Sequence, residues 1–233
     1  MKILMINGTM RMGSTYHVGK LLIEKIAKED DEICELFLPR DMPEFCRGCG
    51  VCFMESETKC MDYLMYMKRF TRLIDAADLL VFTSPVYVLH ISGGMKALLD
   101  HYGYRYMFHR PEKSMFQKQA ICIATAAGGG MKSALKDMKD SLFFWGVARI
   151  HTYGVAVKAI SWDQVNDEIK TKIDQDTDRI VSKLIPDPQS VKPGIRTKIL
   201  FYIARSMNKK NGNPADTIYW KENGWLDKER PWK

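Results

Sequence analysis

Four of the six cysteines lie close together, as Cys46-Arg-Gly-Cys49-Gly-Val-Cys52 followed by Cys60. Each Cys-x-x-Cys turn brings two sulfurs toward one point, and this spacing is typical of a [4Fe–4S] cluster or a Zn²⁺ site. Two alternatives stay open, namely free thiols left by a lost site and disulfides. The stretch Met1–Asn7 is too short for the apolar part of a secretory signal. We therefore expect a cytoplasmic protein with reduced thiols.

A second group of polar residues follows the first apolar run, between Asn7 and the start of an expected helix. The N–H groups and the positive dipole end of a helix N-terminus favour an anion such as a phosphate. The candidate phosphate ligands are Thr9, Arg11, Gly13, Ser14 and Thr15. Their spacing matches neither G-x-G-x-x-G nor G-x-x-x-x-G-K-[ST], which disfavours a dinucleotide site and an NTPase P-loop. Simple capping of the helix by Ser14 or Thr15 is the alternative.

Two further loops have compositions that suit a flat ring. The turn at 83–88 is stiffened by a proline and holds an aromatic side chain, and three glycines at 128–130 let the backbone approach a ligand closely. The candidate ring contacts are Pro85, Val86, Tyr87, Thr125, Ala126, Gly128 and Gly129. A phosphate site without a nucleotide fingerprint, together with two such loops, suggests that the ligand is flavin mononucleotide (FMN). An ordinary turn and a loose helix start are the alternatives.

Strand and helix patterns alternate along the first 185 residues. Strands are expected at Lys2–Ile6, Ile33–Leu38, Leu79–Thr83, Ala120–Thr125 and His151–Val157, with helices between and after them. This alternation predicts an α/β fold with a doubly wound, five-stranded parallel sheet. Ligands on such sheets bind at the carboxyl ends of the strands, and the three candidate FMN loops each follow a strand. The cysteine segment at 39–60 is expected to be one long loop, and a helix is expected at about 61–77.

The composition changes near residue 185, so we expect a domain at 1–185 and an extension at 186–233. The extension has a proline-rich linker, an amphipathic helix marked by Ile195, Ile199 and Ile203, and a tryptophan-rich tail. It can pack on its own domain or on a partner subunit. The 35 Lys and Arg residues outnumber the 28 Asp and Glu residues but form no dense basic block, which argues against nucleic acid. No apolar run approaches the ~20 residues that span a bilayer, so no membrane partner is expected.

As a set, these motifs resemble those of NAD(P)H-dependent FMN reductase-like proteins, and more closely their iron–sulfur flavoprotein branch. The resemblance rests on the cysteine motif, on Gly8-Thr9-Met10-Arg11 with Gly13-Ser14-Thr15, and on Ser84-Pro85-Val86-Tyr87 with Ser92-Gly93-Gly94-Met95-Lys96 and Asp100. It implies a flavodoxin-like fold with strand order 2-1-3-4-5, FMN on the three loops and NAD(P)H as donor. It also implies a [4Fe–4S] cluster on the four cysteines, and homodimers or homotetramers in which flavin and cluster of different subunits meet. Val88-Leu89 departs from the aromatic residue that many relatives have after the tyrosine.

The main hypothesis is an FMN-dependent electron-transfer flavoprotein that exchanges electrons with a redox partner or a small-molecule acceptor. In such proteins the chain binds and orients the cofactor, so we assign no catalytic residue. Of the five scattered histidines, His90 and His101 flank the expected ring-side helix. The second hypothesis is an NAD(P)H-dependent FMN or quinone reductase without a cluster, whose cysteines are vestigial or hold zinc. The third is a non-enzymatic binding or regulatory module.

Overall fold

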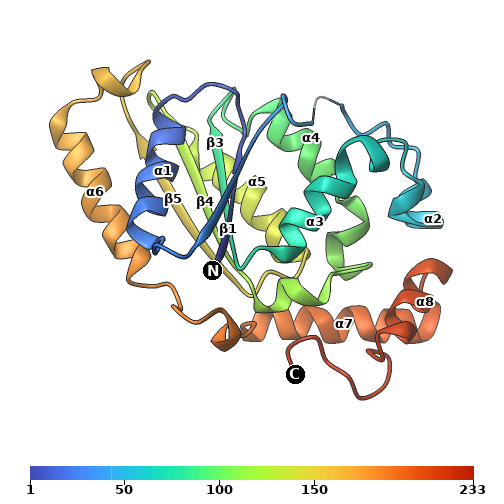
Figure 1. The fold of residues 1–233 in the computed structure, drawn as a ribbon. Helices are drawn as coiled ribbons and strands as arrows, with labels where there is room; N and C mark the ends of the chain where they lie inside the picture. The colour runs from blue at the N-terminus through green and yellow to red at the C-terminus, as the bar shows by residue number, and fades with distance from the viewer. Residues whose placement is uncertain (43) are drawn as a thin grey trace.

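The computed structural model describes residues 1–42 and 44–233, and one sheet of five parallel strands forms its centre (Figure 1). The strands are β1 (Lys2–Asn7), β2 (Glu32–Phe37), β3 (Leu79–Pro85), β4 (Gln119–Ala126) and β5 (Arg149–Ala156). Their order, β2-β1-β3-β4-β5, confirms the doubly wound, flavodoxin-like fold. Each expected strand is found, with ends that differ by at most two residues.

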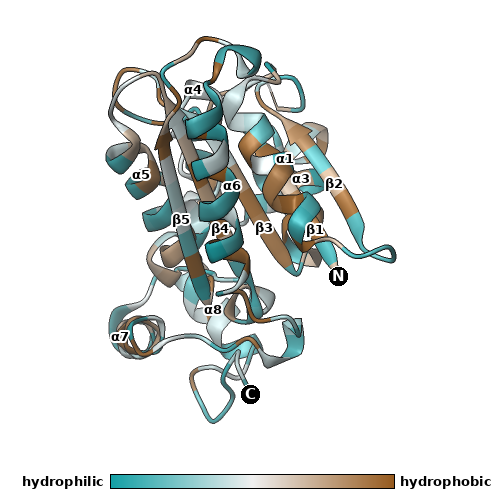
Figure 2. Cartoon of the chain, turned by 90° about the vertical axis from the view of Figure 1, so that its left-hand side faces the viewer, coloured by the Kyte–Doolittle hydropathy of each residue, from teal (hydrophilic) through white to brown (hydrophobic). Residues whose placement is uncertain are grey.

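Helices cover both faces of the sheet because its central strands are apolar on both sides. Alternate residues of β1 point to opposite layers, Ile3 and Met5 to one core and Leu4 and Ile6 to the other. The first layer holds α1 (Ser14–Ile26) and α6 (Asp167–Val181), and the second holds α3 (Lys68–Ala76), α4 (Gly93–His101) and α5 (Met131–Phe144). In Figure 2 the apolar colour runs along β3 between these layers.

The cysteine segment is more ordered than a long loop. Residues 51–59 form a short helix, α2 (Val51–Met54), and a 3₁₀ turn at Glu57–Lys59, so the expectation of a structureless segment is wrong for its second half. Gly50 starts α2 with a φ of 74°, a left-handed conformation that glycine adopts without strain. Position 43, within the expected loop, lies outside the described residues. The helix expected at about 61–77 divides into a π-helical turn at Tyr63–Met67 and α3.

The C-terminal segment packs on its own chain. It contains α7 (Ile195–Asn211), and α8 (Pro214–Glu222), which the apolar pattern did not predict. Phe201, Trp220 and Trp225 form a third core with Phe108 and Phe116, which belong to the connection between α4 and β4. Figure 1 shows α7 along the end of the sheet opposite to the loops that follow the strands. No helix in the described part of the chain is both long and apolar enough to cross a membrane.

Candidate functional site

The first candidate site is an open pocket with a cavity of about 150 Å³ at the carboxyl ends of β1, β3 and β4. It lies where the strand order reverses, which is where doubly wound sheets bind ligands. The residues expected to contact FMN that line it are Thr9, Arg11, Gly13, Ser14, Thr15, Pro85, Val86, Tyr87, Thr125 and Ala126. Gly128 and Gly129 lie outside this lining, in open space at the end of the β4 loop.

The N-terminus of α1 forms the polar end of this pocket. Its N-cap is Gly13, which has no side chain to accept hydrogen bonds from the first turn. The Ser14 hydroxyl is buried and has no hydrogen-bond partner among the described residues, an arrangement that costs roughly 1–3 kcal/mol unless a ligand provides the bond. Neither this hydroxyl nor that of Thr15 caps the helix, because the Thr15 hydroxyl pairs with that of Thr125 at 2.6 Å. An anion such as the FMN phosphate fits these open donors.

Arg11 connects the phosphate end to the loop after β5. Its Nη2 donates to the carbonyl oxygen of Ile160 at 2.6 Å, which fixes the guanidinium at the pocket wall. Sequence reasoning missed this loop, which adds Val157, Ala159 and Ile160 to the lining. The available signal was topological, because β5 is paired with β4 and its carboxyl end therefore opens at the same edge of the sheet.

The ring-side wall after β3 contains a tight turn. Tyr87 and His90 exchange two backbone hydrogen bonds, and Val88 and Leu89 between them have φ values of 49° and 67°. Two positive φ angles define a type I′ turn, which normally requires Asn or Gly, and each costs of order 1–3 kcal/mol for other residues. The side chain of His90 is exposed and lies 2.9 Å from the Asp137 carboxylate, so it does not line the pocket. Strain of this kind is common at ligand sites.

The second candidate site is a small hollow, with a cavity of about 30 Å³, on the cysteine segment. All four predicted metal ligands, Cys46, Cys49, Cys52 and Cys60, line it, and all six cysteines of the chain are free thiols. Four thiolates around one Zn²⁺ at about 2.3 Å stand about 3.8 Å apart. Within the described part of the chain, no three of these sulfurs lie within 4.8 Å of one another. The four thiols share one hollow and are candidate ligands of a metal centre there.

Burial controls the ionisation of the two inner thiols. It raises the pKa of Cys52, and the other three cysteines raise it further, whereas the charge of Arg110 lowers it. Burial also raises the pKa of Cys60, and a hydrogen bond from the backbone N–H of Asp62 opposes this by lowering the same pKa. These thiols thus resist deprotonation as long as no cation joins them, and a bound metal centre would remove that resistance.

Asp62 and His101 complete the wall of the cysteine hollow, and the sequence did not connect them with it. His101 Nδ1 donates to the carbonyl of Ala97 at 2.8 Å, and its Nε2 lies 3.0 Å from Asp62 Oδ2. Cys60, Asp62 and His101 each offer one ligand atom, and these atoms lie within 4.8 Å of one another. The three side chains can therefore also hold a metal ion, with the hydrogen bond from Nδ1 orienting the ring. The proximity of Asp62 to Cys60 in the sequence was the only available signal.

A doubly wound parallel sheet of order 2-1-3-4-5, with a pocket at the helix start beside the β1–β3 reversal, defines the flavodoxin-like class of proteins. Within this class, the family model for NADPH-dependent FMN reductase matches residues 1–161. The chain belongs to this family of FMN-dependent oxidoreductases, as its motifs suggested.

Individual relatives agree with this family. An iron–sulfur flavoprotein of Archaeoglobus fulgidus is 26% identical over 212 residues, which cover 88% of this chain and 90% of the relative. Among solved structures, an azoreductase from Bacillus anthracis has a TM-score of 0.59 at 15% identity, covering 78% of this chain and 99% of its own. An NAD(P)H:quinone oxidoreductase from Methanothermobacter marburgensis has a TM-score of 0.59 at 15% identity, with coverages of 79% and 99%. At these identities, the solved structures establish the shared fold alone.

Proposed function

We propose that this protein is an electron-transfer flavoprotein with FMN in the pocket at the strand ends and a [4Fe–4S] cluster in the cysteine hollow. One observation carries the proposal: all four cysteines of the motif line one hollow. NAD(P)H is the proposed donor, and a redox protein or a small molecule is the proposed acceptor. We assign the protein to the cytoplasm, where thiols stay reduced.

In the flavin pocket the chain binds and orients, and the bound FMN supplies hydride and single-electron transfer. The Ser14 hydroxyl and the N–H groups at the start of α1 would hold the phosphate. The Arg11 guanidinium, already fixed by Ile160, would add charge-assisted hydrogen bonds. Pro85–Tyr87 and Thr125–Ala126 would form the walls beside the ring. Gly128 and Gly129, beside which an added Cβ would meet nothing within 4 Å, would leave the backbone of this loop accessible to the ring.

In the cysteine hollow, the four thiolates would hold the cluster, which supplies one-electron transfer. The backbone N–H of Asp62 faces the Cys60 sulfur and would withdraw electron density from it. The pair of Asp62 and His101 is buried behind this ligand, which fixes its surroundings and limits access of water. Such contacts set the redox potential of a cluster.

We further propose that the protein works as a homodimer or homotetramer. The two pockets share no lining residue, so contact between subunits offers a route between them. Large apolar side chains are exposed around both pockets, as subunit interfaces require. They are Met10, Met12, Val88 and Leu89 near the flavin pocket, and Phe45, Met61, Leu64 and Met65 near the cysteines.

Anaerobic purification, followed by iron, acid-labile sulfide, zinc and flavin analysis, tests the proposal. We expect one FMN, four irons and matching sulfide per chain, with broad visible absorption added to the flavin bands. One zinc and no sulfide would overturn the cluster and make the site structural.

The second candidate is an NAD(P)H-dependent FMN or quinone reductase without a cluster, and the exposure of Cys46 and Cys49 favours it. Full reductase activity from protein that contains FMN but no metal would support this candidate. A protein with neither FMN nor metal would instead support a non-enzymatic module.

A further inference from the structure

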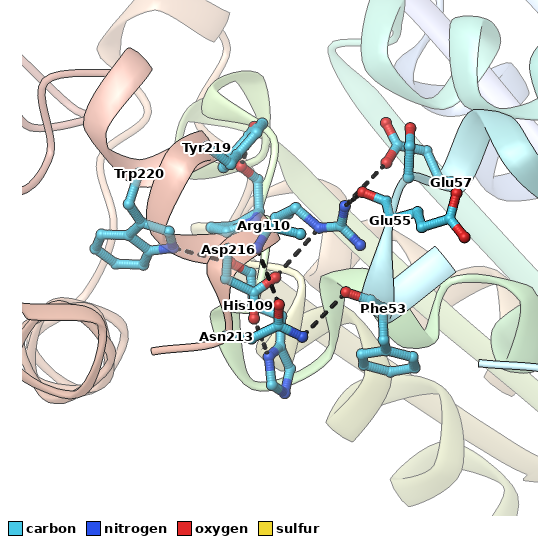
Figure 3. A network of polar contacts seen from close by, with 12 residues as sticks. Phe53, Glu55, Glu57, His109, Arg110, Asn213, Asp216, Tyr219 and Trp220 are labelled. Carbon is cyan, nitrogen blue, oxygen red and sulfur yellow. Dashed lines mark hydrogen bonds and ion pairs between the residues drawn. The ribbon is translucent and has the colours of Figure 1, made fainter. Parts of the chain in front are cut away.

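A network of polar contacts joins the C-terminal helix α8 to the cysteine segment, far from it in the sequence (Figure 3). Asn213, the N-cap of α8, uses both ends of its amide. Its Oδ1 accepts from the N–H of Ala215 at 2.9 Å, and its Nδ2 donates to the carbonyl oxygen of Phe53 at 3.1 Å. Phe53 follows Cys52 in α2, so this hydrogen bond fixes the end of the helix that carries a proposed ligand.

Arg110 makes the second connection between α8 and this segment. Its Nε lies 3.3 Å from Asp216 Oδ1, and both side chains are at least 95% buried. Its Nη1 donates to the carbonyl oxygen of Glu55 at 3.3 Å and lies 3.6 Å from the Glu57 carboxylate. A buried arginine thus links α8 to the turn that leads to Cys60, whose N–H in turn bonds to the carbonyl of Glu57.

Packing supports the same connection. The Phe53 ring meets the His109 ring edge-on with centroids 5.4 Å apart, and it also covers Gly103, where an added Cβ would stand 3.2 Å from it. His109 Nδ1 lies 2.7 Å from Asp216 Oδ2, so the same carboxylate of α8 orients both His109 and Arg110.

We propose that α8 is a clamp for the cysteine segment, in which Asn213, Asp216 and Arg110 are positioning residues that hold Cys52 and Cys60 in their metal-binding arrangement. The proposal rests on the proposed cysteine centre. The C-terminal segment lies outside residues 1–161, which the family model matches. The proposal gives this segment a role at the cysteine site. It also explains why an expensive buried ion pair stands there, because such pairs add little stability by themselves.

The test uses a pair of matched variants of the full chain, purified anaerobically. Asn213→Asp keeps an N-cap oxygen for α8 but replaces the donor to Phe53 with a carboxylate that repels its carbonyl. Tyr219→Phe is the control, because it removes one hydrogen bond from the same helix, to the carbonyl of Pro111, and none to the cysteine segment.

Two measurements apply to both variants: iron release to a chelator, and hydrogen exchange of the backbone at 51–60. We expect Asn213→Asp to release iron about tenfold faster, the scale of one lost hydrogen bond with added repulsion, and to exchange faster at 51–60. Its FMN content should stay at the wild-type level, and Tyr219→Phe should match the wild type in both measurements. Equal behaviour of the two variants would overturn the clamp. Should the wild type hold no iron, the cluster proposal fails, and the exchange measurement still decides the clamp.

Discussion

The two candidate sites are built from different kinds of structure. The flavin pocket is formed by the ends of strands in one sheet, whose register is set by backbone pairs such as Thr83 with Ile123. The cysteine hollow is lined mainly by residues 46–52 and 60–62, and a few side-chain hydrogen bonds hold the short helical pieces between them to the rest of the chain. A pocket that follows from the sheet persists as long as the fold does. A pocket held by separate contacts can be gained, retuned or lost while the fold stays the same.

The strongest test of this difference is to remove one cysteine ligand. We expect Cys60→Ser to lose nearly all iron, because a hard oxygen replaces a soft sulfur ligand. FMN should remain at wild-type stoichiometry, because the two pockets share no residue. Metal and flavin analysis of the purified variants measures both. Cys34→Ser is the matched control, since Cys34 lies on β2 outside both pockets. This variant should keep the iron content of the wild type. Loss of FMN together with iron would contradict the independence of the sites.

A single hydroxyl tests the flavin pocket in the same way. Ser14→Ala should raise the FMN dissociation constant about tenfold, or about 1.4 kcal/mol, the value of one hydrogen bond to a charged group. The melting temperature of the FMN-free protein should stay equal or rise, because the variant lacks a buried hydroxyl without a partner. Titration with FMN and thermal unfolding measure the two effects, and iron content should not change.

Ser114→Ala is the matched control for this variant. Ser114 also has a buried hydroxyl without a partner in the residues that the structure describes, but it lies outside the flavin pocket. It should leave FMN affinity unchanged. An equal loss of FMN affinity in both variants would contradict the placement of the FMN phosphate at the N-terminus of α1.

The smallest expected effect concerns strain beside the flavin pocket. Replacing Val88-Leu89 by Asn-Gly should stabilise the protein by about 1 kcal/mol, because asparagine and glycine adopt the positive φ angles of a type I′ turn readily, whereas valine and leucine do not. For a chain of this size, that corresponds to a rise of about 2–4 °C in melting temperature. Val88→Ala with Leu89→Ala removes the same apolar side chains but keeps the positive φ angles, so it should give no such rise. If the two double variants have the same melting temperature, the turn is not strained.

Sequence reasoning predicted the sheet and brought together most of the residues that line the pocket at the strand ends, for a physical reason. Strands, glycine turns and helix starts are local patterns, and the parallel sheet brings the loops after them to one edge. It could not predict that Ile160 would hold Arg11, because that contact joins residues 149 positions apart. The same holds for α8 and its contacts with Phe53 and Glu55, which depend on tertiary packing rather than on a local pattern. The order within 51–59 was missed because its helices are shorter than the periodicity that reveals a helix.

The hydrogen bond between Asn213 and Phe53 also has a consequence for biosynthesis. The two residues are 160 positions apart, and α8 is the last helix that the structure describes. At roughly 5–20 residues per second, the ribosome makes Asn213 about 8–30 s after Phe53. During that interval the strands that precede Asn213 can begin to assemble, while the cysteine segment still lacks its contacts with α8. Assembly of the proposed cluster is thus expected to follow the synthesis of α8, whereas the pocket at the strand ends can form earlier.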